Sequence, residues 1–413
     1  MKKTIYIIIG ICVLFVSCGK DRTNEYEERT ARDHWIFEVM QEEYLWGDVL
    51  TEVAWKDYFA QPQDFLSKLT QQAPVKDTWS WCEIDTLPQD HHERGYFNHL
   101  SSYGLDLFVM TDPTGETSRQ FARIMTVYAN SPASRCGLQR GDFISMVDGT
   151  KINTSVVKNL VNGKRRTLIV ERLIQNESEV TLEWGDAQTI EMDASEFVAD
   201  IAYPISKVFS TESGKIGYLM CNRLVDDNLD ATMASFSGTE YDAFVLDMRL
   251  CNDGTLDMAC NLASYFVDES QRGQLFAKTI YSEKKQAQNA SILFDEEAIS
   301  HHMKTNYVYV ITSSYTQGAA EWLIRGLKKA LGDEYVVIVG MTTAGQIVMT
   351  GEIPSDFYVT LHPAVAYVAD ADEDYNYADG LNVDIELDER SALYLYPYGS
   401  EKELLLNTIL NHE

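Results

Sequence analysis

Residues 200–400 alternate short apolar strands with amphipathic helices, and this alternation restricts the fold more than any other feature of the chain. Apolar runs typical of buried strands lie at 215–220, 243–249, 307–312 and 335–339, with apolar residues at helical spacing over 258–267 and 319–331. Strands that alternate with helices predict a parallel sheet with right-handed crossovers. Ligands of such sheets bind beyond the carboxyl ends of the strands, so we expect a site at the loops 250–255 and 313–318.

Two further folded parts precede this segment. Residues 30–80 carry apolar side chains at helical spacing and predict a small N-terminal helical bundle. Residues 85–195 contain short apolar runs separated by turn signals, which predict a β-rich domain. We assign the core to 196–400 and a C-terminal tail helix to 401–413. The fold class expected is mixed α/β, with three folded parts.

The N-terminus predicts an export signal. Two lysines precede an almost wholly apolar run at 5–16, which is too short to span a bilayer and fits a secretory signal over 1–17. Phe15-Val16-Ser17-Cys18 resembles a bacterial lipobox, in which the cysteine becomes the lipidated first residue. This resemblance implies lipidation of Cys18, a polar tether over 18–29 and a place in the bacterial cell envelope, anchored to the outer membrane. An ordinary signal peptide with an incidental cysteine is the alternative.

Charge and cysteine usage exclude several classes of function. The chain has 34 Lys and Arg against 63 Asp and Glu, a net charge of −29, which argues against a nucleic-acid partner. Cys12 leaves with the signal, and the five cysteines beyond Cys18 form no C-x-x-C pair, so we expect no zinc site and no cofactor. The sequence allows one disulfide among these five cysteines. The other interpretation is that they are buried thiols that pack as small apolar side chains.

Acidic residues crowd the segment 370–379, which has the first spacings of a calcium loop. Its sixth position is Tyr375, where the loop needs glycine, and its twelfth is Leu381, where it needs glutamate. We therefore expect an exposed acidic hairpin tip and no metal.

The most specific pattern of the β-rich segment is NSPASRCGLQRGDFISMVDG at 130–149. It combines a Pro-started helical turn, two glycine turns and an Asp-Gly hairpin, and it closely resembles a PDZ domain of the bacterial protease type. PDZ domains bind extended peptides at a sheet edge and hold the terminal carboxylate with backbone N–H groups. The resemblance implies a carboxylate-binding turn at Tyr103 and Gly104, with Leu105 and Leu107 lining the pocket; a plain strand start is the alternative.

Four further motifs stand in the order found in C-terminal processing (tail-specific) serine peptidases, which are related to tricorn protease. They are LDMRLCNDG at 246–254, TSSYTQGAAE at 312–321, GMTTAGQ at 340–346 and ADGLNVD at 378–384. Together with the helical segment and the PDZ pattern, this resemblance covers nearly the whole chain after the signal. It implies a serine nucleophile at a helix N-terminus, a lysine base and an oxyanion pocket of backbone N–H groups.

Both members of that catalytic dyad are missing. By the motifs, the nucleophile position falls on Gly318 and the base position on Gln346, and neither side chain can do the chemistry. The expected oxyanion loop contains Gly254 and the N–H of Ala319, but Asp253 replaces a glycine there and would repel an oxyanion.

We therefore expect an inactive homologue that binds extended peptides or unfolded protein C-termini. One alternative is an active serine peptidase with a displaced nucleophile at Ser313, Ser314 or Thr316. Another is a cell-surface accessory protein that binds glycans or nutrients. The sequence does not indicate the oligomeric state.

Overall fold

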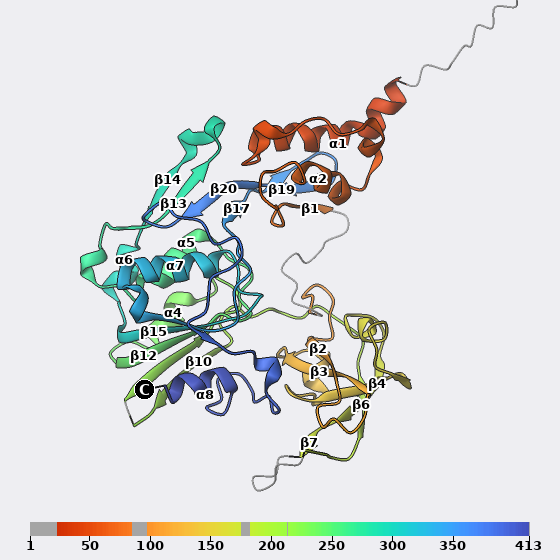
Figure 1. Ribbon diagram of the computed structural model, residues 1–413, viewed down its shortest axis with the longest axis vertical. Coiled ribbons are helices and arrows are strands. Elements are labelled where there is room, and N and C mark those ends of the chain that lie inside the picture. The colour runs from red at the N-terminus through yellow and green to blue at the C-terminus, as the bar shows by residue number, and fades with distance from the viewer. Residues whose placement is uncertain (1–22, 85–96, 175–181, 213, 413) are drawn as a thin grey trace, which may run out of the picture.

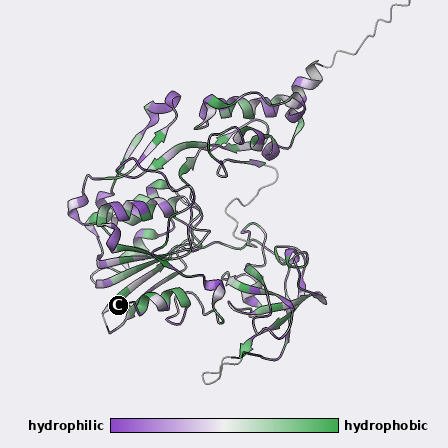
Figure 2. Cartoon of the chain, in the orientation of Figure 1, coloured by the Kyte–Doolittle hydropathy of each residue, from purple (hydrophilic) through white to green (hydrophobic). Residues whose placement is uncertain are grey.

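A six-stranded sheet organises the C-terminal half of the protein (Figure 1). The computed structural model describes residues 23–84, 97–174, 182–212 and 214–412, so the expected signal at 1–17 and Cys18 lie outside the described residues. The strands, in spatial order, are β10 (Ile205–Ser210), β11 (Lys215–Met220), β12 (Glu240–Asp247), β15 (Lys304–Thr312), β16 (Val336–Gly340) and β21 (Ile385–Glu386). Strand β10 runs antiparallel to β11 and the other neighbours are parallel, as the alternating pattern predicts. Figure 2 shows these strands as largely apolar.

Helices cover both faces of this sheet, because its strands are apolar on both sides. Helices α5 (Leu256–Ser264) and α7 (Ala319–Leu331) pack on one face with Phe244, Leu246 and Val308. Helix α8 (Leu404–Leu410), the expected tail helix, buries its leucines against Tyr218 and Val245 on the other face. Shorter helices and 3-10 turns complete the core: α4 (Leu229–Ala234), α6 (Glu296–Ser300), η4 (Glu269–Gln271), η5 (Glu283–Gln288), η6 (Asp333–Tyr335) and η7 (Glu389–Ser391).

A second, four-stranded sheet lies beside α7. Its order is β14 (Ala290–Leu293), β13 (Leu275–Tyr281), β20 (Ala364–Ala369) and β17 (Val348–Thr350), all antiparallel. Strand β17 therefore forms an edge of this sheet.

The β-rich segment contains a sheet in the order β2-β3-β4-β6-β9, with β5 paired to β4, and a separate two-stranded sheet of β7 and β8. Its elements are β2 (Leu105–Thr111), β3 (Gln120–Val127), α3 (Pro132–Arg135), β4 (Phe143–Val147), β5 (Thr150–Lys151), η3 (Val157–Leu160), β6 (Arg166–Glu171), β7 (Leu173–Ile174), β8 (Glu183–Trp184) and β9 (Gln188–Met192). Ser131 caps α3 by accepting from the N–H of Ser134, as the Pro-started turn predicts. This domain has an apolar core of its own.

The N-terminal domain contains α1 (Thr23–Glu43), η1 (Gly47–Val49), η2 (Trp55–Phe59), α2 (Pro62–Thr70) and strand β1 (Trp81–Ile84). Helix α1 begins inside the segment assigned to a tether, because residues 25–29 (Glu-Tyr-Glu-Glu-Arg) are mostly good helix formers. Strand β1 follows the helices in the chain and pairs with β19 (Val359–His362). Strand β19 also pairs with β18 (Ile353–Pro354). None of the described helices is long and apolar enough to cross a membrane.

Buried arginines join the PDZ-like domain to the core. Arg123 donates to the carbonyl oxygens of Ala392 (2.6 Å) and Leu393 (2.9 Å). Arg140 donates to Glu389 at 2.7 Å, and Glu389 also accepts from Arg249 of the motif loop after β12. Arg140 and Arg249 are almost fully buried, so their charges are balanced by carboxylates inside the interface rather than by solvent.

Candidate functional site

Two loops leave the carboxyl ends of the central strands and meet at the start of α7. The loop after β12 and the loop after β15 are joined by backbone bonds from Met248 N–H to Ile311 O (2.9 Å) and from Gln317 N–H to Cys251 O (3.1 Å). Strand order therefore brings the first two motifs together at the edge where the sequence predicts a site.

Gly318 is the N-cap of α7, with φ +57° and ψ −115°. Residues with a side chain rarely adopt a backbone conformation with positive φ, whereas glycine adopts it freely. A Cβ atom at this position would lie 3.1 Å from Gln346 Oε1 and 3.4 Å from its Nε2. Gly318 and Gln346, the two positions that the motifs assign to the dyad, therefore lie within side-chain reach of each other, although neither carries a reactive group.

The buried carboxylate of Glu321 holds these two positions together. One oxygen accepts from the backbone N–H of Gly318 (2.9 Å) and Gln346 (2.7 Å), and the other from the Gly345 N–H (2.6 Å) and the Thr343 hydroxyl. Burial raises the pKa of Glu321, and the four hydrogen bonds oppose that shift. The motif glutamate is therefore a structural link between α7 and the loop after β16.

Gln346 is itself fixed by backbone contacts. Its side-chain Nε2 donates to Val348 O at 3.0 Å. Its backbone carbonyl oxygen accepts from the Trp322 indole (3.2 Å) and the Tyr377 hydroxyl (2.9 Å). An amide held in this way neither titrates nor transfers a proton, so it cannot serve as a base.

The expected oxyanion loop lies against the N-terminus of α7. A Cβ atom on Gly254 would lie 2.6 Å from Leu224 Cβ and 3.0 Å from Ala319 Cβ, so only glycine fits between them. Ala319 is the first residue of α7, where backbone N–H groups have no acceptor within the helix. Gly254 and Ala319 are therefore neighbours, as the motifs imply.

Asp253 does not face this pocket as an uncompensated charge. Its carboxylate accepts from Arg223 at 2.6 Å and 2.7 Å, and its carbonyl oxygen accepts from the Leu224 N–H at 2.8 Å. The expected repulsion of an oxyanion is thus offset by an arginine that the sequence did not mark, because no local pattern links residues 223 and 253.

The hydroxyl groups near Gly318 are engaged elsewhere. Thr316 is fully buried and donates to Met248 O at 2.8 Å, and Ser313 donates to Arg249 O. Ser314 lines a separate cavity between the PDZ-like domain and the core. None of the three lies among the residues that line the cleft at Gly318.

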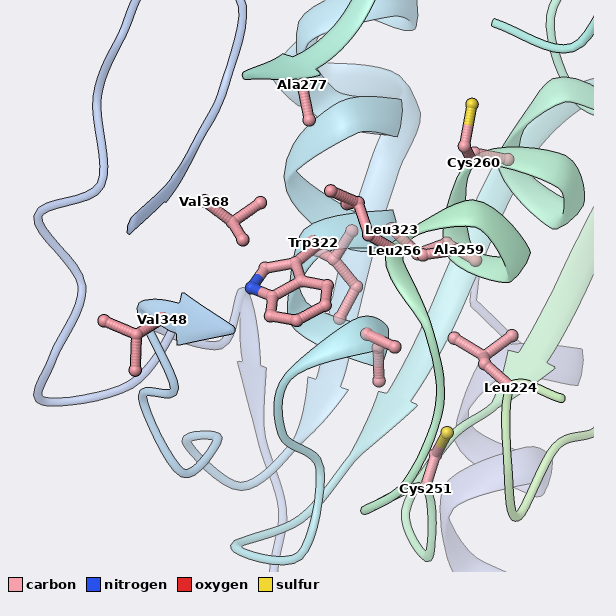
Figure 3. Close-up of a cluster of buried hydrophobic side chains, with 14 of the residues drawn as sticks. Leu224, Cys251, Leu256, Ala259, Cys260, Ala277, Trp322, Leu323, Val348 and Val368 are labelled. Carbon is pink, nitrogen blue, oxygen red and sulfur yellow. The ribbon is translucent and has the colours of Figure 1, made fainter. Parts of the chain in front are cut away.

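A cleft of about 430 Å³ opens over the dyad positions. Its walls come from the loops after β12, β15 and β16, from α7, from β17 of the four-stranded sheet, and from β1 and β19. They include Trp81, Glu83, Asp253, Gly254, Gln317, Gly318, Ala319, Trp322, Gln346, Met349, Thr350, Glu352 and His362. Trp81 and His362 are paired across β1 and β19, with ring centroids 3.7 Å apart. Sequence reasoning missed both, because nothing local indicates that these two strands pair. Figure 3 shows Trp322 among the buried side chains of the core cluster, together with Leu323 and Val348.

The residues expected to hold a peptide carboxylate in the PDZ-like domain stand at the start of β2. Tyr103 and Leu105 are fully buried and Leu107 nearly so. The Gly104 N–H donates to Ser102 Oγ at 2.8 Å, and the Gly104 carbonyl oxygen accepts from the Tyr128 N–H. Peptide capture by this turn stays a prediction.

The segment 370–379 is not a hairpin tip, so that part of the expectation was wrong, although Asp372 and Glu373 are exposed. Strand β20 ends at Ala369 and runs into a loop rather than a returning strand. Asp370 is 3% exposed, and its carboxylate lies 2.5 Å from Arg325, while Asp372 lies 2.8 Å from Lys329. Cations on α7 therefore draw this acidic segment against the core, and no described group of side chains has a metal-binding arrangement.

Comparisons with known proteins agree with this architecture. Profiles of peptidase family S41, of a PDZ domain and of the S41 N-terminal domain match residues 215–387, 123–172 and 31–81. A search of the curated proteins gives no match.

Two solved structures resemble the whole chain. A crystal structure from Bacteroides fragilis, named as an S41 protease, is 30% identical, with a TM-score of 0.78 and coverage of 91% of this chain and 96% of that one. The photosystem II D1 C-terminal processing protease is 15% identical, with a TM-score of 0.50 and coverage of 87% and 93%, and shows the shared fold. The chain therefore belongs to peptidase family S41.

Proposed function

We propose that this protein is a non-catalytic member of its family, exported to the bacterial envelope, which binds extended peptides in the cleft over α7. The proposal is supported by the closeness of Gly318 and Gln346, since a Cβ atom on Gly318 would lie 3.1 Å from the Gln346 side chain. These are the positions that the motifs assign to the dyad, and neither side chain has the chemistry of a nucleophile or a base. Two independent substitutions at one site argue against a chance misalignment of either motif.

The cleft favours an extended peptide as its ligand. Met349 and Thr350 of the edge strand β17 line it, and an edge strand offers backbone groups to a peptide that adds alongside. Trp81, His362 and Trp322 supply apolar and aromatic walls for side chains. The loops that shape the pocket are held by Glu321 and Arg223, so the cleft is formed without a ligand.

The activity test uses the mature protein, unstructured polypeptides and a fluorophosphonate probe. We expect neither cleavage nor labelling of the natural chain. The double variant Gly318→Ser with Gln346→Lys should take up the probe, because the new side chains start within contact distance. Cleavage by the natural chain that disappears in Ser314→Ala or Thr316→Ala would overturn the proposal.

A binding screen of extended peptides against soluble glycans tests the ligand class. We expect peptide binding that weakens at least tenfold in Thr350→Pro, since proline removes a backbone donor from the edge strand. Asp356→Pro, in the exposed turn before β19, is the matched control. Binding of glycans alone would refute the peptide assignment.

A further inference from the structure

Two cysteines from distant parts of the chain meet beside the oxyanion loop. Cys221 follows β11 and Cys251 lies in the loop after β12, and their Sγ atoms are 4.0 Å apart. Both side chains are fully buried, and both carry free thiols in this structure. Each of the pair also has an Sγ contact to a backbone oxygen, Cys221 to Arg223 and Cys251 to Asp253. For the other three cysteines of the described chain, the Sγ contacts are to oxygen: Cys82 to Gln63, Cys136 to Ala133 and Cys260 to Leu293.

The two thiols sit at the base of paired segments. Residues 221–224 run alongside 251–254, joined by backbone bonds from Leu224 N–H to Asp253 O (2.8 Å) and from Thr255 N–H to Leu224 O (3.1 Å). The Arg223–Asp253 ion pair adds a side-chain link. The cysteines are held by backbone bonds of their own, from Cys221 N–H to Asp247 O (2.9 Å) and from Cys251 N–H to Met248 O (3.0 Å).

We propose that Cys221 and Cys251 form a disulfide in the exported protein, which fixes the oxyanion loop to the end of β11. The Sγ atoms would approach from 4.0 Å to about 2 Å, the length of a disulfide bond. The bond ties Gly254 and its neighbours in place, so the wall of the cleft becomes covalently supported. The proposal rests on export to an oxidising compartment and not on peptide binding.

The oxidant is a protein disulfide of a thiol–disulfide oxidoreductase. The thiolate of one cysteine attacks that disulfide, forms a mixed disulfide and releases one oxidoreductase thiol. The second cysteine then attacks the mixed disulfide, forms the Cys221–Cys251 bond and releases the other thiol. Two electrons and the two thiol protons pass to the oxidoreductase. Burial raises the pKa of the Cys221 thiol well above its ordinary value. The thiol–disulfide exchange therefore takes place during folding, before the two cysteines are buried.

The test is a mass measurement on the full chain isolated from the envelope of a bacterial host. Thiols are alkylated in denaturant without reduction, and the protein is then digested. Trypsin leaves Cys221 in peptide 216–223 but Cys251 and Cys260 together in 250–272. Cleavage before aspartate, at Asp253, then separates Cys251 in peptide 250–252.

We expect peptides 216–223 and 250–252 joined by a bond that reduction breaks, and alkylated Cys260. Cys260→Ala should keep the link, whereas Cys221→Ala should leave Cys251 alkylated. In Figure 3, Cys260 lies on α5 and apart from Cys251, which makes it the matched control. Alkylation of both Cys221 and Cys251 in the natural chain, or a link from either to another cysteine, overturns the proposal. Failure of peptide binding leaves this measurement unaffected.

Discussion

Replacement of Glu321 by glutamine should destabilise the core although the two side chains have nearly the same shape. Each carboxylate oxygen accepts two hydrogen bonds. A glutamine amide has one oxygen and one NH₂ group, and the NH₂ group cannot accept from a backbone N–H. The loss therefore depends on which way the amide points.

In one orientation the NH₂ group faces the N–H groups of Gly318 and Gln346, and both lose their acceptor. In the other it faces the Gly345 N–H and the Thr343 hydroxyl, and the hydroxyl can turn to accept. The better orientation still leaves one buried N–H unpaired, which costs about 1–3 kcal/mol, and the remaining bonds lose charge assistance. Glutamine avoids the burial of a charge, which offsets part of this loss. We expect a net loss of about 2–4 kcal/mol.

Urea unfolding of the natural chain and Glu321→Gln measures this difference. Glu401→Gln, at an exposed residue, is the control and should change stability by less than about 0.5 kcal/mol. Hydrogen exchange at the amides of Gly345 and Gln346 gives a local readout, and their protection should fall more than that of β12. A loss below about 1 kcal/mol with unchanged protection would refute the role assigned to this carboxylate.

Three further outcomes follow from buried contacts. Gly254→Ala should lower the free energy of unfolding by about 3 kcal/mol, because its Cβ would overlap the facing backbone, whereas Gly115→Ala, where nothing lies within 4 Å, should cost only about 1 kcal/mol in the same urea assay. Burial raises the pKa of Glu403, but the neighbouring arginines outweigh it and lower the pKa to about 2. The stabilising contribution of this carboxylate is therefore complete above pH 4.5 and should disappear as the pH falls towards 2. In acid titrations, the difference in unfolding free energy between the natural chain and Glu403→Gln, about 3 kcal/mol by linkage, should close over that range. Arg123→Met should lower the unfolding free energy by about 2–4 kcal/mol because it leaves interdomain carbonyl groups unpaired, while Arg165→Met at an exposed ion pair should change it by less than about 1 kcal/mol in thermal unfolding.

Local periodicity was sufficient for the elements that contain the catalytic motifs. Helix α7 begins at Ala319 and ends at Leu331, as its 3, 4 and 7 spacing predicts, because glycines flank both ends. The two strand-end loops meet where parallel strand order requires. The closeness of Gly318 and Gln346 follows from the resemblance to serine peptidases, in which the residues at these two positions act together.

The walls of the cleft could not be predicted in the same way. Trp81 and His362 become neighbours through a four-residue strand that pairs with a partner far along the chain. Arg223 neutralises Asp253 across two segments that share no motif. The burial of Asp370 depends on the charge of Arg325 on a separate helix. Each is a tertiary pairing, and periodicity within a segment carries no information about it.

The backbone at Gly318 has a consequence for the history of the site. A serine at φ +57° and ψ −115° carries strain of about 1–3 kcal/mol, which a catalytic chain must offset elsewhere in its fold. Glycine releases that strain while the surrounding hydrogen bonds keep the same path. Under the proposed function, a chain that no longer needs cleavage therefore gains stability from glycine at this position and loses stability when serine replaces it.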